Sequence, residues 1–224
     1  MIIRRLNQGT KSKECRFVEI CDLLQGYNCD LWIFTESNLA IELDGYYRES
    51  SSKSPYIKKS RFYGKPNLYH QVAIYSRHSL TKLEIQEPIN GLLCSIQLGD
   101  VSFLIYGNVI TLKDRNSDNS KRYSDRLEEQ IQAISQLPLH HTIIGGDFNL
   151  KKTWPRGAHK KISEALKPKG WKWPTEDQNH TVQQVLHSPD LLSKVSIDTS
   201  VRHDKGKQNR LSDHPLVIIE VDLL

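Results

Sequence analysis

Short apolar runs, each closed by a polar or turn-forming residue, recur along most of the 224-residue chain. Runs of this length and composition are typical of buried strands. Strands are expected at residues 1–7, 30–34, 72–75, 92–98, 101–109, 141–145, 182–187, 195–199 and 216–219. Helical periodicity predicts helices at residues 13–26 and 120–137. Because strands outnumber helices and several are adjacent hairpins, we predict an α/β four-layer sandwich, in which two packed, mainly antiparallel β-sheets are flanked by helices.

The length is enough for one large core and short for two, so we expect a single domain over residues 1–224. No apolar run approaches the roughly 20 residues that cross a bilayer, and the N-terminus has no apolar signal region. We therefore expect a cytoplasmic monomer without a membrane partner. The four cysteines, Cys15, Cys21, Cys29 and Cys94, lack a paired metal-ligand spacing and are expected to be reduced.

The net charge is only +5, but the charges are sorted along the chain. Residues 48–65, 151–172 and 202–210 together hold 18 of the 31 Lys and Arg residues and 3 of the 26 acids. One interpretation is three solvated basic loops that have no partner. The other is a basic rim that recognises a polyanion.

The segment Gly145-Gly146-Asp147-Phe148-Asn149 follows an apolar strand. The glycines allow a sharp turn and a close approach to a ligand. Asp147 and Asn149 are two residues apart, so both can point to one side. A carboxylate can orient a water molecule and a carboxamide can donate to a phosphate oxygen, although a structural Asx turn would use the same residues.

Polar residues also lie next to three other expected strands, at the end of two and before the third. Ser212-Asp213-His214-Pro215 comes between a basic segment and the last apolar strand, Glu36 follows the strand 30–34, and Asn7 ends the first strand. Each of these alone is also compatible with an ordinary turn or cap. Together they place chemistry-bearing side chains at several strand ends, where open sheets carry their sites.

In this order, the motifs resemble the endonuclease/exonuclease/phosphatase superfamily, the fold of pancreatic deoxyribonuclease and of the abasic-site endonucleases. The resemblance covers nearly the whole chain. It includes the strand before Glu36, the strand Val72 to Tyr75, the strand through Asn108, and the turns Gly146 to Asn149 and Ser212 to Pro215.

The resemblance implies hydrolysis of a phosphoester by in-line attack of water. It implies that Glu36, supported by Asn7 and Asp213, binds Mg²⁺, for which Mn²⁺ can substitute. Asp147 would orient or activate the water. Asn149, His214 and Asn108 would contact the scissile phosphate.

Two positions depart from the family pattern. Gln183 stands where an aspartate usually orients the catalytic histidine, and a glutamine cannot stabilise an imidazolium by charge. Asp198 or Asp204 are possible substitutes. Asn108 stands where Tyr or His is more common, and Tyr106 is the alternative at that strand.

The basic segments favour a nucleic acid as substrate, because lysine and arginine contacts to phosphate dominate non-specific binding. The candidate substrate-binding residues are Lys151, Lys152, Arg156, Lys160, Lys161 and Arg210. Trp154, Trp171 and Trp173 either stack on unpaired bases or wedge a loop against the core. We predict a metal-dependent nuclease acting on DNA or RNA. A phosphatase or phosphodiesterase for phosphoinositide or another small phosphoester, and a weakly active nucleic-acid-binding protein, are the alternatives.

Overall fold

The computed structural model describes residues 13–51, 69–84, 91–110, 122–150, 157–178, 183–198 and 215–224. In these parts of the chain the helices are α1 (Lys13–Gly26), α2 (Tyr123–Ser135) and α3 (Ala158–Leu166), the last followed by a 3₁₀ turn at Lys167–Lys169. The strands are β1 (Leu31–Asn38), β2 (Tyr47–Ser50), β3 (Tyr69–Ser76), β4 (Leu80–Leu83), β5 (Gly91–Leu98), β6 (Val101–Val109), β7 (Thr142–Asp147), β8 (Gln183–His187), β9 (Leu191–Asp198) and β10 (Leu216–Leu223).

The described strands form a five-stranded sheet in the order β4-β5-β6-β7-β8, a three-stranded sheet in the order β1-β3-β2, and a β9-β10 ribbon. Their pairings are antiparallel except for the parallel pair β6-β7. That parallel pair matters for function, because parallel strands bring their carboxyl ends to one edge of a sheet. The edge at which β6 and β7 end is called the β6–β7 edge below.

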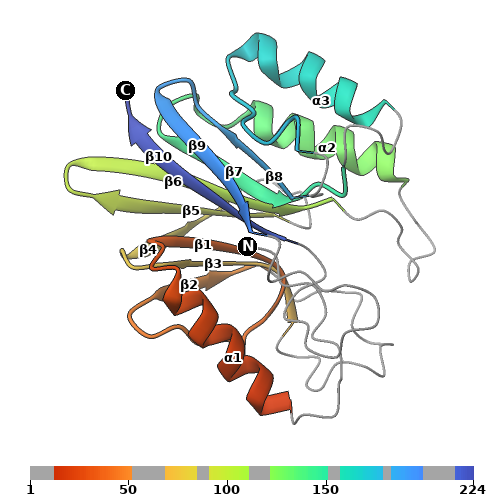
Figure 1. Cartoon of the computed structure of the whole chain (residues 1–224). Coiled ribbons are helices and arrows are strands. Elements are labelled where there is room, and N and C mark those ends of the chain that lie inside the picture. Colours follow the sequence, from red (N-terminus) through yellow and green to blue (C-terminus); the bar gives the residue numbers. More distant parts are fainter. Residues whose placement is uncertain are drawn as a thin grey trace.

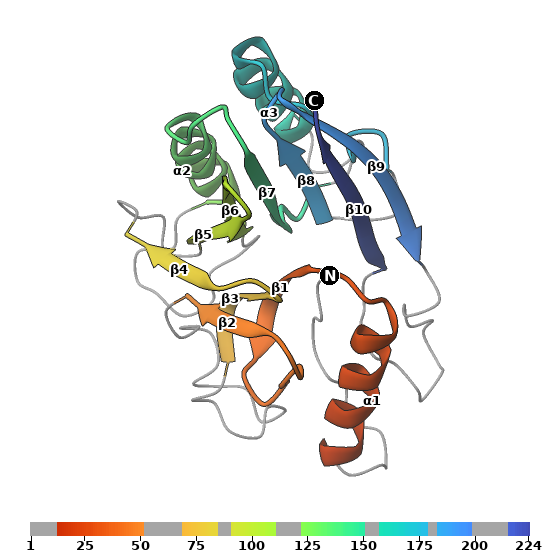
Figure 2. The ribbon, with the colours of Figure 1, turned by 90° about the vertical axis from the view of Figure 1, so that its left-hand side faces the viewer.

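Three apolar clusters separate four layers (Figures 1 and 2). Ile20 and Leu24 of α1 pack with Trp32 and Phe34 of β1 on the outer side of the three-stranded sheet. A second cluster contains residues of both sheets, and the third contains residues of the five-stranded sheet with α2 and α3. The expected sandwich of two mainly antiparallel sheets with helices on the outside is confirmed.

Most expected elements are present with shifted ends. The hairpin turns at Gly99, whose φ of +59° suits glycine. The helix expected at 120–137 is shorter, and the Asp125 carboxylate accepts a hydrogen bond from the Arg122 backbone at its start. The first expected strand, residues 1–7, lies outside the described residues.

Three elements were not predicted. β2 and β4 are four-residue strands of mostly polar residues, so they carry no apolar run. α3 lies within the basic segment 151–172, where lysines conceal the apolar spacing of Ala158, Ile162 and Leu166. That part of the segment is therefore an ordered helix against the core, and the interpretation of the whole segment as a solvated loop was wrong.

Two further expectations concern the cysteines and membrane-spanning helices. Cys21, Cys29 and Cys94 are free thiols, as predicted, and burial raises the pKa of each. Within the described ranges, no helix is both long and apolar enough to cross a membrane.

Candidate active site

Four polar residues lie at neighbouring positions on the β6–β7 edge. Asn108 of β6 stands opposite Gly146 of β7. Gln183, the first residue of β8, stands opposite Asp147, the last residue of β7. Asn149 follows Asp147 by two residues, so four of the residues highlighted by the sequence meet at one end of the sheet.

Gly146 permits this close approach. A Cβ atom at this position would lie less than 3.0 Å from both the backbone carbonyl oxygen and the Oδ1 atom of Asn108. The backbone carbonyl cannot move aside as a flexible side chain can. Glycine is therefore required for Asn108 to pack directly against the end of β7. The close approach to a ligand expected of this glycine stays a prediction.

The turn at Asp147 and Asn149 is held on several sides. The Asn149 backbone N–H donates to Asp147 Oδ1 at 2.8 Å, and Asn149 Nδ2 donates to the Ile110 carbonyl at 2.9 Å. The Ile110 N–H in turn donates to the Asp147 carbonyl at 2.8 Å. Asn149 has a φ of +48°, which asparagine tolerates better than most residues. This is the Asx-type turn that the sequence left open, and it fixes the Asp147 carboxylate in a buried position.

Asn108 has an unusual environment. Its side chain is fully buried, and neither Oδ1 nor Nδ2 has a hydrogen-bond partner among the described residues. A buried polar group without a partner costs about 1–3 kcal/mol. Such a cost is commonly retained at functional sites, and an amide at this edge offers a donor and an acceptor to a ligand.

Glu36 belongs to the facing sheet, on the strand that packs against β7. Ile33 of β1 packs over Gly145, where its Cδ1 lies 2.8 Å from the place of a Cβ atom. Glu36 lies three residues beyond Ile33, which is about 10 Å along an extended strand. The approach of the Glu36 carboxylate to the β6–β7 edge stays a prediction.

The backbone of Glu36 is itself in the left-handed region, with a φ of +49°. The pairing of β1 with β3 runs to Thr35 and resumes at Ser37. A non-glycine residue in this conformation costs on the order of 1–3 kcal/mol, and such strain gathers at functional sites. The left-handed backbone also turns the half-buried Glu36 side chain away from the direction that regular alternation along a strand would give it.

Oxygen donors suit the metal that the sequence implies. Glu36 supplies a carboxylate, and Mg²⁺ prefers such hard oxygen ligands. Glu36 is the one member of the expected ligand set that lies among the described residues. The other expected ligands, Asn7 and Asp213, lie outside the described residues, as do His214, Lys151, Lys152, Arg156 and Arg210.

Tyr106 is not a second candidate at this site. Its hydroxyl donates to Gln130 Oε1 of α2 at 2.8 Å, and the ring is buried among the residues that join the sheet to the helices. Burial raises the pKa of Tyr106 strongly, although the hydrogen bond to Gln130 opposes the effect. The alternative role considered for Tyr106 is therefore wrong, and Asn108 is the residue of β6 at the edge.

Tyr123, at the start of α2, was missed by sequence reasoning. Its hydroxyl donates to the Phe148 carbonyl at 3.0 Å, in the middle of the Asp147 turn. Burial and the nearby Asp147 charge raise the pKa of Tyr123, so it stays a neutral donor. No sequence signal links a tyrosine at a helix start to a turn 25 residues later.

The tryptophans separate into two groups. Trp171 and Trp173 are only 3% and 7% exposed and belong to the core against α2 and α3. Trp173 Nε1 donates to Gln184 Oε1 at 2.8 Å. The core interpretation is confirmed for both, and base stacking by them was wrong. Trp154 lies outside the described residues.

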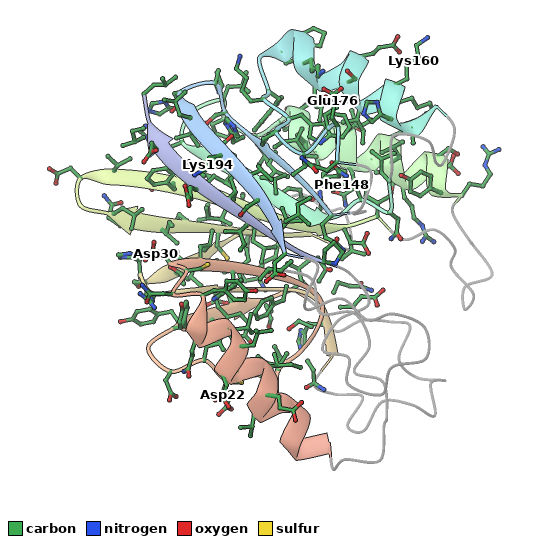
Figure 3. All side chains as sticks on the ribbon, in the orientation of Figure 1. Asp22, Asp30, Phe148, Lys160, Glu176 and Lys194 are labelled. Atoms are coloured by element: carbon green, nitrogen blue, oxygen red, sulfur yellow. The ribbon has the colours of Figure 1, made fainter. Side chains whose placement is uncertain are left out.

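Lys160 and Lys161 of α3 have acidic neighbours. Lys160 Nζ lies 3.6 Å from Glu164, and Lys161 Nζ lies 2.5 Å from Glu128 of α2. Figure 3 shows Lys160 on the outer side of the helix layer, away from Phe148. Their contact with substrate stays a prediction.

Comparison with known proteins gives the family of this chain. Residues 7–214 match the model of the Endonuclease/Exonuclease/phosphatase family. No curated protein sequence matches the chain.

Several solved structures have a similar fold at low sequence identity. The endonuclease domain of TRAS1, a telomere-specific non-LTR retrotransposon, is 13% identical, with a TM-score of 0.65, 100% of this chain covered and 95% of that chain. The D. rerio TDP2 structure with a single-strand DNA product is 16% identical, with a TM-score of 0.63 and coverage of 95% and 93%. The Bacteroides thetaiotaomicron mannosyl-6-phosphatase Bt3783 is 14% identical, with a TM-score of 0.64 and coverage of 99% and 98%.

Proposed function

Since this chain belongs to the Endonuclease/Exonuclease/phosphatase family, we propose that it is a divalent-metal-dependent phosphodiester hydrolase that cleaves nucleic acid, with DNA as the first candidate substrate. The observation that carries the proposal is the buried Asn108 amide, which has no hydrogen-bond partner among the described residues and lies beside the Asp147 turn. A phosphate oxygen would accept from Nδ2 there without displacing a protein contact.

In the proposed reaction, Asp147 orients a water molecule for in-line attack on phosphorus and takes its proton. The rigid turn described above supports this role, because a preorganised carboxylate needs little reorganisation as charge develops. Asn108 and Asn149 would donate to the phosphate oxygens, together with His214. A Mg²⁺ ion held by Glu36, Asn7 and Asp213 would neutralise the phosphate and leaving-group charges.

Gln183 bears on how His214 works. It lies opposite Asp147 at the edge and is neutral, so it can orient an imidazole but cannot stabilise its cation. We therefore propose that His214 acts as a neutral hydrogen-bond donor. Asp198 is a less favourable substitute, because it already accepts a hydrogen bond from the Tyr27 hydroxyl.

The polyanion preference rests on the sorted basic residues of the sequence, and a single-strand DNA product is named for one fold neighbour. The second candidate function is hydrolysis of a small phosphoester, which the naming of another neighbour as a mannosyl-6-phosphatase favours. A single active protein assayed on both classes separates these possibilities.

The purified protein should be incubated with supercoiled plasmid, single-stranded DNA, RNA, a phosphoinositide panel and a sugar phosphate, each with Mg²⁺, Mn²⁺ or EDTA. We expect metal-dependent cleavage of nucleic acid and none with EDTA. Hydrolysis of a small phosphoester but of no nucleic acid would overturn the nuclease proposal. Binding of DNA without any hydrolysis would indicate a non-catalytic member of the family.

Asp147→Asn is the decisive variant, because it keeps the shape of the buried side chain and removes its charge. We expect turnover to fall by about 10²–10⁴-fold, the usual contribution of a positioned acid or base. The matched control is Asp22→Asn, which changes an exposed carboxylate on α1 (Figure 3). Equal activities of the two variants would mean that Asp147 is not the catalytic carboxylate.

A further inference from the structure

A second polar cluster lies at the opposite end of β7 from the candidate active site. His140 and His141 precede the strand, and Asp190 lies in the turn between β8 and β9. Asp190 Oδ2 lies 2.9 Å from His140 Nδ1 and 3.4 Å from His141 Nε2. Six residues of extended chain separate His141 from Asp147, about 20 Å, so the cluster is separate from the proposed hydrolytic site.

The backbone brings both imidazoles to one side. Consecutive residues in an extended chain normally point to opposite faces. His141 instead has a φ of +46°, which L side chains rarely adopt. The ring centroids of His140 and His141 consequently lie only 3.7 Å apart, with an angle of 30° between their planes.

The carboxylate is fixed by the protein. Asp190 Oδ2 also accepts a hydrogen bond from the His141 backbone N–H at 2.9 Å. The position of Asp190 therefore does not depend on the imidazoles alone.

The neighbouring His187 does not belong to the ligand set. Its Nδ1 lies 2.8 Å from the Ser188 carbonyl and its Nε2 lies 2.8 Å from Ser193 Oγ. Both ring nitrogens are thus engaged by neutral groups. The cluster offers two imidazole nitrogens and one carboxylate oxygen, and the three atoms lie within 4.8 Å of one another.

We propose that His140, His141 and Asp190 bind one transition-metal ion of the Zn²⁺ and Cu²⁺ class, with solvent as a further ligand. Nitrogen ligands favour these ions over Mg²⁺. Bonds of about 2.0–2.1 Å in a tetrahedron separate neighbouring ligand atoms by about 3.3 Å. The observed distances of 2.9 and 3.4 Å fall on either side of that value, so binding needs shifts of only a few tenths of an ångström along these two edges.

The exposure of the ligands fits a site open to solvent. The His140 side chain is 72% exposed, whereas those of His141 and Asp190 are 19% and 24% exposed. An ion could enter from the His140 side and keep a water ligand there. It would join the start of β7 to the β8–β9 turn and so clamp two strands of the five-stranded sheet.

The test is metal binding, which does not depend on hydrolytic activity. Cu²⁺ should be added to the Glu36→Gln protein, so that the site proposed for Mg²⁺ is disabled, and electron paramagnetic resonance recorded. We expect nitrogen coupling from two imidazoles. Coupling should fall to one nitrogen in His140→Ala, whose exposed side chain can be removed without disturbing the core.

Zn²⁺ should also be titrated calorimetrically into the same proteins. Removal of His140 should weaken binding by at least about tenfold, since loss of even an outer-shell partner has that effect. Zn²⁺ at about 100 times its Kd should raise the Tm by about 5–10 °C. The control is His78→Ala, an imidazole outside the cluster that should leave both results unchanged. Absence of nitrogen coupling, or unaltered binding in His140→Ala and Asp190→Asn, would show that these three residues form only a hydrogen-bonded cluster.

Discussion

Substituting alanine for Gly146 tests whether the close approach of β6 and β7 creates the site. A methyl group there would overlap the Asn108 carbonyl and Oδ1, because both lie less than 3.0 Å from the Cβ position. Overpacking of this kind costs about 1–3 kcal/mol. For a protein of this length the Tm should fall by about 2–12 °C, since each kcal/mol lowers it by roughly 2–4 °C.

The effect on turnover should exceed the effect on stability. Asn108 must move to relieve the overlap, and a displacement of about 1 Å at a catalytic group can cost about 10²-fold in rate. Thermal unfolding followed by circular dichroism gives the first quantity, and initial rates on the best substrate of the panel give the second. The measurements should be made well below the Tm of the variant, so that a loss of rate is not a loss of folded protein.

Two other glycines provide graded controls. At Gly145 the nearest atom is the flexible Cδ1 end of Ile33, at 2.8 Å, so alanine should cost some stability and little turnover. At Gly26, the last residue of α1, no atom lies within 4 Å of the Cβ position, so alanine should be neutral or slightly stabilising. If Gly146→Ala kept the rate of the natural protein, or if Gly145→Ala lost as much rate, the assignment of Asn108 to the site would be refuted.

Three further substitutions test the roles of Tyr106, His187 and the two lysines of α3. Tyr106→Phe should lower the free energy of unfolding by about 1–3 kcal/mol by leaving buried Gln130 unpaired, with kcat unchanged; a large loss of kcat would restore Tyr106 as a catalytic candidate. Burial lowers the pKa of His187, so protonation opposes folding, and the natural protein should lose stability relative to His187→Gln as the pH falls below about 6.5 in urea titrations. Lys160→Gln with Lys161→Gln should reduce the slope of log Kd against log salt by up to about 2 for DNA binding, and an unchanged slope would exclude both lysines from the interface.

Sequence patterns were sufficient where local chemistry decides structure. The run through Ile143 and Ile144 predicted a buried strand, and two glycines followed by Asp147 predicted a tight turn. The sequence did not reveal α3 because its buried apolar residues recur only every fourth position between polar residues. Its N-cap, Gly157, also lacks the side-chain oxygen that usually marks a helix start.

Features that depend on tertiary contact could not be read from the chain. The left-handed backbone of Glu36 interrupts the pairing of β1 with β3, and no neighbouring residue in the sequence indicates it. The hydrogen bond from Tyr123 to Phe148 joins a helix to a strand end only after both have packed. The burial of Trp171 and Trp173 likewise reflects the position of α3, which composition had assigned to a basic segment.

The candidate site combines residues on strands with residues of the basic segments, and the two groups suit different roles. Asn108, Asp147 and Glu36 belong to strands or strand ends, whose positions are fixed by the sheets and by glycine contacts. Groups so placed suit the step common to all phosphoesters, which is attack at phosphorus. Discrimination between a polynucleotide and a small phosphoester must then come mainly from residues outside these strands, among which the sequence offers the basic positions of 151–156 and 202–210. Replacing the lysine and arginine residues of those two segments by neutral residues should therefore change KM and the class of substrate that is cleaved. The metal dependence and the requirement for Asp147 should stay the same.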